Sequence, residues 1–293
     1  MKIQGKIGAI FQDQMPEIWL SIKKMHLGLS TYTFPWNIQL SGRLGSHRFS
    51  FREMLELTAE NGIRYFQFGD NYPLHLLTNK ELDELKKTAS AKNISLQAGT
   101  RGLHMDNISR YLLIAKELET GFLRVVTDDG DFHPPEDEVM LTIRQLLPIL
   151  KETGIVLAIE NHDRFKAKTL VRIIEHTDPE YVAVCLDTAN SLGAGEGINE
   201  ILPLLLPYTV NLHIKDFTIS RVDHKMGFLV SGAAAGEGML DIPHLIRECG
   251  KYDRCTTASL ELWINEEASP EDTLEKELNW IKRSITFLNN YIQ

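Results

Sequence analysis

Four side chains able to bind a metal ion each stand at the end of an apolar, strand-like run. They are Glu160 in LAIENH, Asp187 in VCLDTAN, His213 in NLHIKD and Glu261 in SLELW. A charged group at the end of a buried strand needs a partner, because burying an unpaired charge is costly. One divalent cation shared by three carboxylates and an imidazole would meet that need. The sequence therefore predicts a metalloenzyme.

The donor set also narrows the choice of metal. Three oxygen donors and one nitrogen, with positions left open for water or substrate, suit Mn²⁺, Mg²⁺ or Co²⁺ better than a structural zinc site. Mn²⁺ is the first choice, with Mg²⁺, Co²⁺ and Zn²⁺ as alternatives. Any one of the four residues, taken alone, could equally be a helix cap or an ion-pair partner. Their recurrence in successive strands favours a shared site.

The order of elements predicts how these residues are positioned. From Met25 onward, short apolar runs alternate with segments of helical periodicity, which gives eight strand–helix units. Strands separated by helices run parallel, and eight such units are expected to close into a (β/α)8 TIM barrel. All four metal-binding candidates then lie at the carboxyl ends of strands, where such barrels carry their active sites. Neighbouring strands are about 5 Å apart, so one ion can reach all four.

Two stretches stand outside this repeat. We expect residues 1–24 to be an N-terminal extension and residues 25–293 to be the catalytic barrel. The extension is either a helix covering the barrel bottom or a mis-assigned start, with Met25 as the true initiator. The segment 218–240 is long for a loop after a barrel strand, and long loops on the catalytic face often act as lids or binding loops.

Composition restricts the partners. Forty acidic residues against 31 Lys and Arg give a formal net charge of −9, and no run of basic residues is present. Nucleic acid and an anionic membrane are therefore not expected as partners, and a small molecule is. Three cysteines without metal-type spacing predict reduced packing residues and a cytoplasmic protein. The sequence has neither a stretch typical of a membrane span nor one typical of a secretion signal.

Further residues are expected around the substrate. His162 and Lys215 each follow a proposed ligand by two positions, so their side chains point to the same side of the strand. The alternative interpretation makes Lys215 an ion-pair partner of Glu160 or Asp216. Around the rest of the pocket we expect Arg101, Asp70 and Trp36. The competing interpretation of Arg101 and Asp70 is that they are caps at the surface, and that of Trp36 is that it is a core residue.

The motifs AIENH, CLDTAN, LHIKD, GEGMLDIPHLI and LELW resemble the xylose-isomerase-like TIM-barrel superfamily, over nearly the whole chain from Met25. This superfamily contains sugar phosphate isomerases and epimerases, ketose 3-epimerases and the endonuclease IV group. The resemblance implies that Glu160, Asp187, His213 and Glu261 are metal ligands and that the two glutamates exchange the substrate's proton. It also implies a homo-oligomer, a dimer or tetramer. Asn190 stands where the family usually has His, which puts the family's substrate contacts in doubt, although we keep Asn190 among the substrate-binding residues.

Together these features predict a divalent-metal-dependent sugar isomerase or epimerase that acts on a ketose or keto-sugar derivative through an enediolate stabilised by the metal. The positive groups Arg101, His162 and Lys215 favour an alternative, a decarboxylase of a 3-oxo sugar acid that uses the same site. An apurinic endonuclease is a weaker hypothesis because the extra histidines of a three-metal cluster are missing from matching positions. A non-catalytic sugar-binding protein is the remaining alternative.

Overall fold

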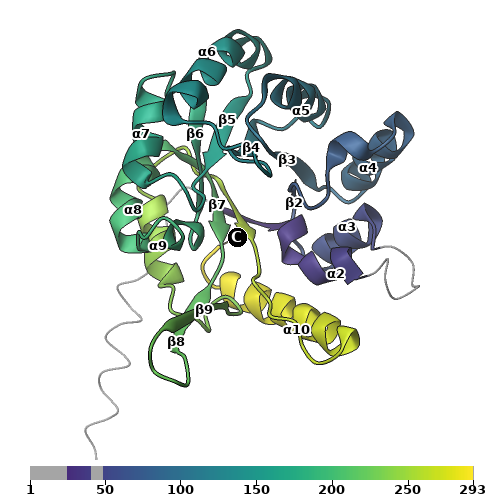
Figure 1. The fold of residues 1–293 in the computed structure, drawn as a ribbon. Helices are drawn as coiled ribbons and strands as arrows, with labels where there is room; N and C mark the ends of the chain where they lie inside the picture. Colours follow the sequence, from purple (N-terminus) through teal and green to yellow (C-terminus); the bar gives the residue numbers. More distant parts are fainter. Residues whose placement is uncertain (1–24, 41–48, 293) are drawn as a thin grey trace, which may run out of the picture.

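Eight parallel strands close into a barrel in the computed structural model, which describes residues 25–40 and 49–292 (Figure 1). Around the barrel the strands follow the order β1-β10-β7-β6-β5-β4-β3-β2. Their bounds are β1 His26–Ser30, β2 Tyr65–Phe68, β3 Ser95–Arg101, β4 Phe122–Val126, β5 Val156–Glu160, β6 Val182–Asp187, β7 Thr209–Ile214 and β10 Thr257–Leu260. The predicted (β/α)8 TIM barrel is confirmed.

Helices surround the barrel on its outside (Figure 1). They are α2 Pro35–Leu40, α3 Phe51–Glu60, α4 Asn79–Ala91, α5 Met105–Glu117, α6 Glu136–Thr153, α7 Ala167–Glu175, α8 Ile198–Leu205, α9 Ile242–Cys249 and α10 Pro270–Leu288. Local sequence sets several of their ends. Thr78 closes a capping box with Glu81 at the start of α4. Gly154 ends α6 at φ 68°, a left-handed conformation that glycine adopts without strain.

The core lies both inside the barrel and between the barrel and its helices. Every residue of β6 is buried, because one face of the strand meets the interior and the other meets the helical layer. All three cysteines are free and buried, as predicted. Within the described ranges, no helix has both the length and the apolar composition needed to cross a bilayer.

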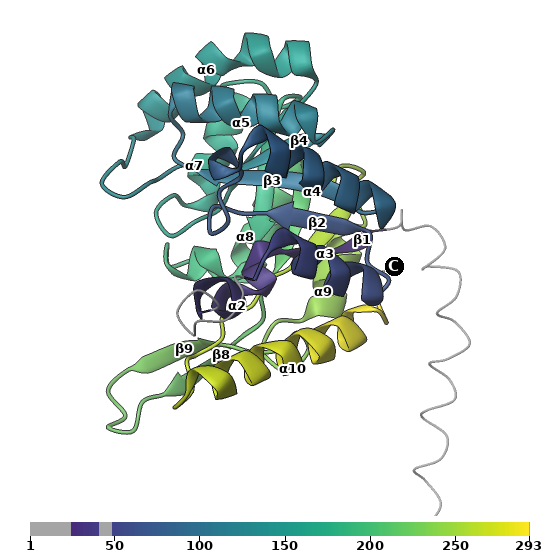
Figure 2. The same ribbon diagram turned by 90° about the vertical axis from the view of Figure 1, so that its right-hand side faces the viewer.

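A hairpin projects from the barrel after β7. Strands β8 Phe217–Arg221 and β9 Phe228–Gly232 pair antiparallel in a separate two-stranded sheet. Figure 2 shows this hairpin extending beyond the end of the barrel, near α10. Much of the expected loop 218–240 is therefore a hairpin, and none of its residues lines the central pocket. A role for this segment as a lid or binding loop stays a prediction.

One short helix was not predicted, and one prediction falls on residues that the structure does not describe. The short helix α2, directly after η1 Thr31–Thr33, was not predicted, because six residues are too few for a periodic signal. The predicted N-terminal extension, residues 1–24, lies outside the described residues.

Candidate metal centre and pocket

The four predicted ligands come from four strands that are neighbours in the barrel. Glu160 and Asp187 are the last residues of β5 and β6, His213 is the fifth residue of β7, and Glu261 directly follows β10. Their side chains are almost fully buried, with at most 3% of any residue exposed. The parallel register aligns Asp187 with His213 across β6 and β7. The structure therefore brings all four to one place inside the barrel mouth.

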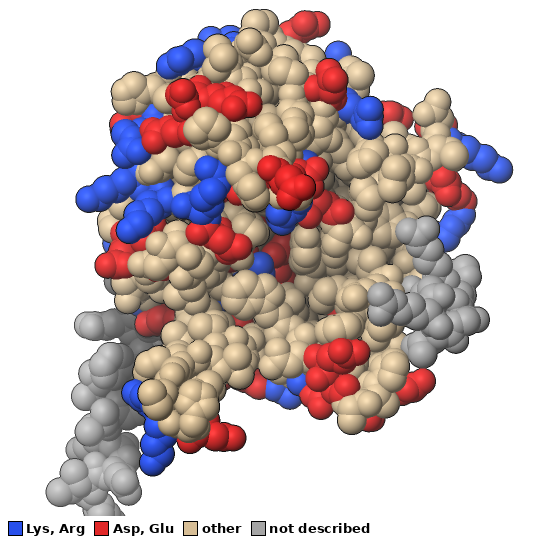
Figure 3. Space-filling view, in the orientation of Figure 1, with Lys and Arg blue, Asp and Glu red and all other residues tan. Residues whose placement is uncertain are grey.

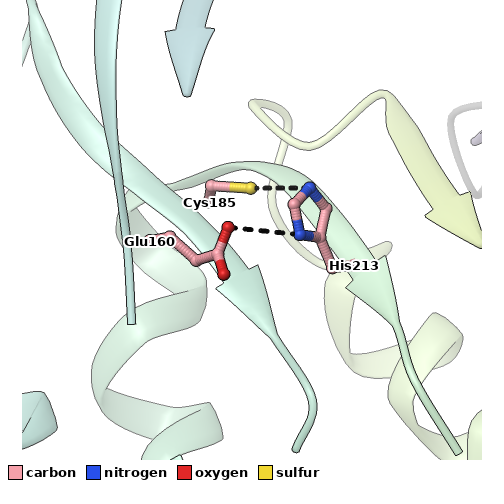
Figure 4. Close-up of side chains that lie close together, drawn as sticks. All are labelled: Glu160, Cys185 and His213. Atoms are coloured by element: carbon pink, nitrogen blue, oxygen red, sulfur yellow. Dashed lines mark hydrogen bonds and ion pairs between the residues drawn. The ribbon is translucent and has the colours of Figure 1, made fainter. Parts of the chain in front are cut away.

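Their functional atoms converge on the imidazole. His213 Nδ1 lies 3.3 Å from Glu160 Oε2 and 3.2 Å from Glu261 Oε1. Asp187, His213 and Glu261 each offer a ligand atom, and these atoms all lie within 4.8 Å of one another. Figure 4 shows Glu160 and His213 facing each other. The set is compact enough to bind one ion.

Two buried atoms in this cluster suit the binding of a cation. His213 Nδ1 has no hydrogen-bond partner. Asp187 Oδ2 lies 2.8 Å from Lys215 Nζ, its ion-pair partner. Buried polar atoms are nearly always paired, so the unpaired imidazole nitrogen needs an explanation. A divalent cation between these carboxylates and the imidazole would contact both His213 Nδ1 and Asp187 Oδ2.

Cys185 is close to the same imidazole but is poorly suited to bind the ion. Its Sγ lies 3.2 Å from His213 Nε2, on the opposite side of the ring from Nδ1 (Figure 4). Burial, followed by the charge of Glu160, raises the pKa of the Cys185 thiol well above its usual range. A metal binds the thiolate rather than the thiol. Glu160 and His213 thus remain as ligand candidates without Cys185.

Two buried cations balance the carboxylates. Arg124, on β4, donates through Nε to Glu160 and through Nη1 to Asp70. Lys215 Nζ lies 2.8 Å from Asp187 and 3.0 Å from Glu261. Burial lowers the pKa of Lys215, but Asp187 and then the two glutamates outweigh this effect and hold the pKa above its usual range. Lys215 therefore stays charged. The alternative interpretation of Lys215 as an ion-pair residue holds, but its partners are Asp187 and Glu261 rather than Glu160 or Asp216.

Asp70 is partly buried and does not itself line the pocket, although it was predicted to bind substrate. Its carboxylate accepts hydrogen bonds from Tyr32 Oη at 3.0 Å and Arg101 Nε at 2.9 Å, in addition to Arg124. Burial raises the pKa of Asp70, but the charge and hydrogen bond of Arg124, followed by those of Arg101, bring it well below its usual range. Asp70 therefore anchors Arg101 and Arg124 at the pocket.

The cluster opens into a cavity of about 420 Å³. Figure 3 shows a hollow at the centre of the face, with acidic and basic atoms at its floor. The predicted residues that line it are Trp36, Arg101, Glu160, His162, Asn190, Lys215 and Glu261. Lining residues that were not predicted include Tyr32, Gln39, Arg124, Asp163, Trp263 and Asn265. A larger hollow of about 700 Å³, between the ends of α4 and α5, contains none of the predicted site residues.

The lining residues have defined contacts. Asn190 Nδ2 donates to Glu160 Oε1 at 2.8 Å, so it holds a ligand candidate in place. Trp36 is not a core residue, and its Nε1 donates to the Ile264 carbonyl at 2.8 Å. The His162 Nδ1 atom lies 3.3 Å from Asp163, and 30% of the His162 side chain is exposed. His162 therefore faces the open part of the pocket.

Comparison with known proteins finds a matching family and a relative of similar length. A family model described as a xylose isomerase-like TIM barrel matches residues 55–284. The 3-oxo-isoapionate decarboxylase of Pectobacterium atrosepticum is 33% identical over 264 residues, which cover 90% of this chain and 95% of that protein.

Solved structures share the fold at low sequence identity. The D-psicose 3-epimerase of Clostridium cellulolyticum, solved with D-tagatose, has a TM-score of 0.67 at 14% identity, over 92% of this chain and 99% of its own. A xylose isomerase-like TIM barrel protein from Mycobacterium smegmatis, in complex with magnesium, has a TM-score of 0.64 at 13% identity. The match covers 91% of this chain and 98% of that protein.

Proposed function

This chain belongs to the xylose isomerase-like TIM barrel family, and from that premise we propose that it is a divalent-metal-dependent decarboxylase of a 3-oxo sugar acid. Such a reaction breaks the bond between the carboxylate carbon and its neighbour. The electrons of that bond move onto the 3-oxo oxygen, and the neighbouring carbon then takes up a proton. The 33% identity to a 3-oxo-isoapionate decarboxylase supports this choice.

The observation that carries the proposal is that both glutamates are fully engaged. Glu160 Oε1 accepts from Asn190 and its Oε2 accepts from Arg124. Glu261 Oε1 accepts from Ser30 Oγ at 3.3 Å, and its Oε2 lies 3.0 Å from Lys215 Nζ. Each oxygen of the two carboxylates thus already has a donor or a cation beside it, and neither glutamate is free to approach a substrate carbon as a base. Decarboxylation requires no base to remove a proton from carbon, whereas epimerisation does.

We assign the metal to Glu160, Asp187, His213 and Glu261, with Mn²⁺ as the expected ion. When bound, such an ion supplies Lewis-acid stabilisation of the negative charge that develops on the substrate's oxo oxygen.

The chain's own residues orient the substrate and supply the proton. Arg101 binds the leaving carboxylate, and the rings of Trp36 and Trp263 on the pocket wall exclude water. His162 donates the proton that replaces the carboxylate, since its imidazole lines the pocket and remains partly exposed.

Release of CO₂ tests the proposal directly. The protein is incubated with Mn²⁺ and a 3-oxo sugar acid labelled with ¹³C in the carboxyl group, and ¹³C NMR follows the labelled carbon. We expect labelled bicarbonate to appear with the enzyme and Mn²⁺ and to be absent after chelation. Retention of the label in the sugar acid across a panel of such substrates would contradict decarboxylation.

One observation favours epimerisation or isomerisation as a second candidate function. Glu160 and Glu261 approach the same His213 nitrogen from different strands, at 3.3 and 3.2 Å, so two carboxylates flank the centre. Incubation of neutral ketoses in D₂O separates the two functions. Solvent deuterium entering a ketose at one carbon, with no loss of CO₂ from any sugar acid, would establish the second candidate in place of the first.

A further inference from the structure

Below the metal centre, a group of buried amides crosses the barrel interior. Gln67 on β2, Gln97 on β3 and Asn211 on β7 are each exposed by 5% or less, and Thr257 on β10 is buried beside them. Barrel interiors are usually filled by apolar side chains. Buried amides are unfavourable unless they are hydrogen-bonded, so their presence here calls for a role.

A backbone carbonyl fixes the direction of this network. Asn211 Nδ2 donates to the carbonyl oxygen of Thr257 at 3.2 Å, and a carbonyl oxygen can only accept. Asn211 Oδ1 therefore faces the other way, where it accepts from Gln67 Nε2 at 3.1 Å. Gln67 Nε2 also donates to Gln97 Oε1 at 3.3 Å. A flipped Gln67 would place its oxygen against two acceptors.

The network ends on the ligand imidazole. With its nitrogen committed to Asn211 and Gln97, Gln67 presents Oε1 to His213 Nε2 at 2.6 Å. An amide oxygen only accepts, so Nε2 must carry the proton. In a neutral imidazole the other nitrogen, Nδ1, then has a free lone pair. Nδ1 is the atom without a hydrogen-bond partner between Glu160 and Glu261.

We propose that Gln67 and Asn211 are positioning residues that hold His213 in the Nε2–H tautomer and so present Nδ1 to the divalent cation. The inference rests on the metal site of the proposed function. Asn211 acts through Gln67. The carbonyl of Thr257 sets the orientation of the Asn211 amide, and this amide in turn sets that of Gln67. A hydrogen bond from the second ring nitrogen orients a ligand histidine, and its loss typically lowers metal affinity by about 10- to 100-fold.

The test compares two equivalent substitutions in the same layer of the barrel. Gln67→Met keeps a similar side-chain volume but removes the acceptor for His213 Nε2. Gln97→Met is the matched control, because Gln97 belongs to the same buried network but does not contact His213. We expect the Kd for Mn²⁺, measured by titration calorimetry, to rise about 10- to 100-fold in Gln67→Met and about threefold or less in Gln97→Met. An equal loss in both variants, or none in Gln67→Met, would overturn the proposal.

A second measurement requires neither metal nor substrate. ¹⁵N NMR of histidine-labelled, metal-free protein at pH 7 reports which His213 nitrogen carries the proton. We expect a proton on Nε2 in the wild type, and loss of that proton from part of the Gln67→Met molecules. A wild-type His213 protonated at Nδ1 alone would refute the inference. Absence of CO₂ release would refute the proposed reaction and leave the tautomer result unaffected.

Discussion

Arg101 is the side chain best placed to meet a substrate carboxylate. Its side chain is 31% exposed, whereas those of Arg124 and Lys215 are 3% and 7% exposed. Among the described residues, Arg101 pairs with one carboxylate, that of Asp70, while Arg124 and Lys215 each contact two. A guanidinium with free donors can bind a carboxylate through two hydrogen bonds.

We therefore predict that Arg101→Gln raises the KM for a 3-oxo sugar acid by about 10- to 100-fold, because hydrogen bonds to charged groups contribute roughly 1.5–3 kcal/mol. Steady-state rates of CO₂ release measure the effect. Arg172→Gln is the matched control, since Arg172 pairs with Glu136 on the outer surface and should leave KM unchanged. A KM that is equal in wild type and Arg101→Gln would assign substrate binding to other residues.

Single residues show what the sequence could and could not predict. Glu160, Asp187, His213 and Glu261 were found because each ends a strand, and strand ends of a parallel barrel share one rim. Arg124 was missed because it lies in the middle of the apolar run FLRVV, where no terminal position marked it. A basic residue inside such a run is itself a signal, since a buried cation requires acidic partners. The contacts of Gln67 with His213 join residues 146 positions apart and had no local signal.

At the level of elements, helix α10 holds α2 beside the pocket. Glu277 on α10 is fully buried, and its carboxylate accepts from the backbone nitrogens of Trp36 at 2.7 Å and Asn37 at 3.0 Å. Those nitrogens belong to the first turn of α2, where amides have no partner within the helix. Trp36 lines the pocket, so this contact links the last helix to the pocket wall.

The same contact predicts a pH-dependent stability. Burial raises the pKa of Glu277 to about 7, although hydrogen bonds from Asn37 and Trp36 partly oppose the shift. The folded state thus holds this proton more tightly than the unfolded state, whose pKa is near 4.5. The contribution of Glu277 to stability is therefore greatest below pH 4.5, falls as the pH rises to about 7, and is constant above that.

Glu277→Gln removes this titration. We expect the free energy of unfolding of the wild type, relative to that of Glu277→Gln, to decrease by about 2 kcal/mol between pH 5 and pH 8. Urea denaturation of both proteins at each pH measures the difference. Glu271→Gln, an exposed position in the first turn of α10, provides the control. A difference that does not change with pH would mean that Glu277 titrates alike in the folded and unfolded chains.

Periodicity predicted the long elements well and the short ones poorly. The barrel strands and their main helices carry patterns of apolar residues that repeat over several turns or alternate along a strand. Helix α2 has six residues and hairpin β8–β9 has five on each side, so neither pattern is long enough to identify its element. The hairpin also exposes apolar side chains such as Phe228 and Leu229, contrary to the usual alternation.

In the whole molecule, the barrel makes one site from distant parts of the chain. Strands β5, β6, β7 and β10 supply the ligand candidates, and β4 supplies Arg124. A cation bound to all four ligands would connect these neighbouring strands. Because the ion binds the folded barrel, it should stabilise the molecule according to its concentration relative to Kd. The homo-oligomer that the resemblance implied stays a prediction.

Thermal unfolding with and without metal measures this coupling. At Mn²⁺ concentrations of about 100 times Kd we expect a stabilisation of about 2.7 kcal/mol, which corresponds to a rise in Tm of roughly 5–10 °C for a domain of this size. Asp187→Asn should lose most of that rise, because it removes the charge of one of the four ligand candidates. Asp137→Asn, exposed on α6, should keep it. The shift is compared within each variant, since Asp187→Asn also removes a partner of Lys215 and lowers the metal-free Tm. An undiminished shift in Asp187→Asn would place the bound ion elsewhere on the molecule.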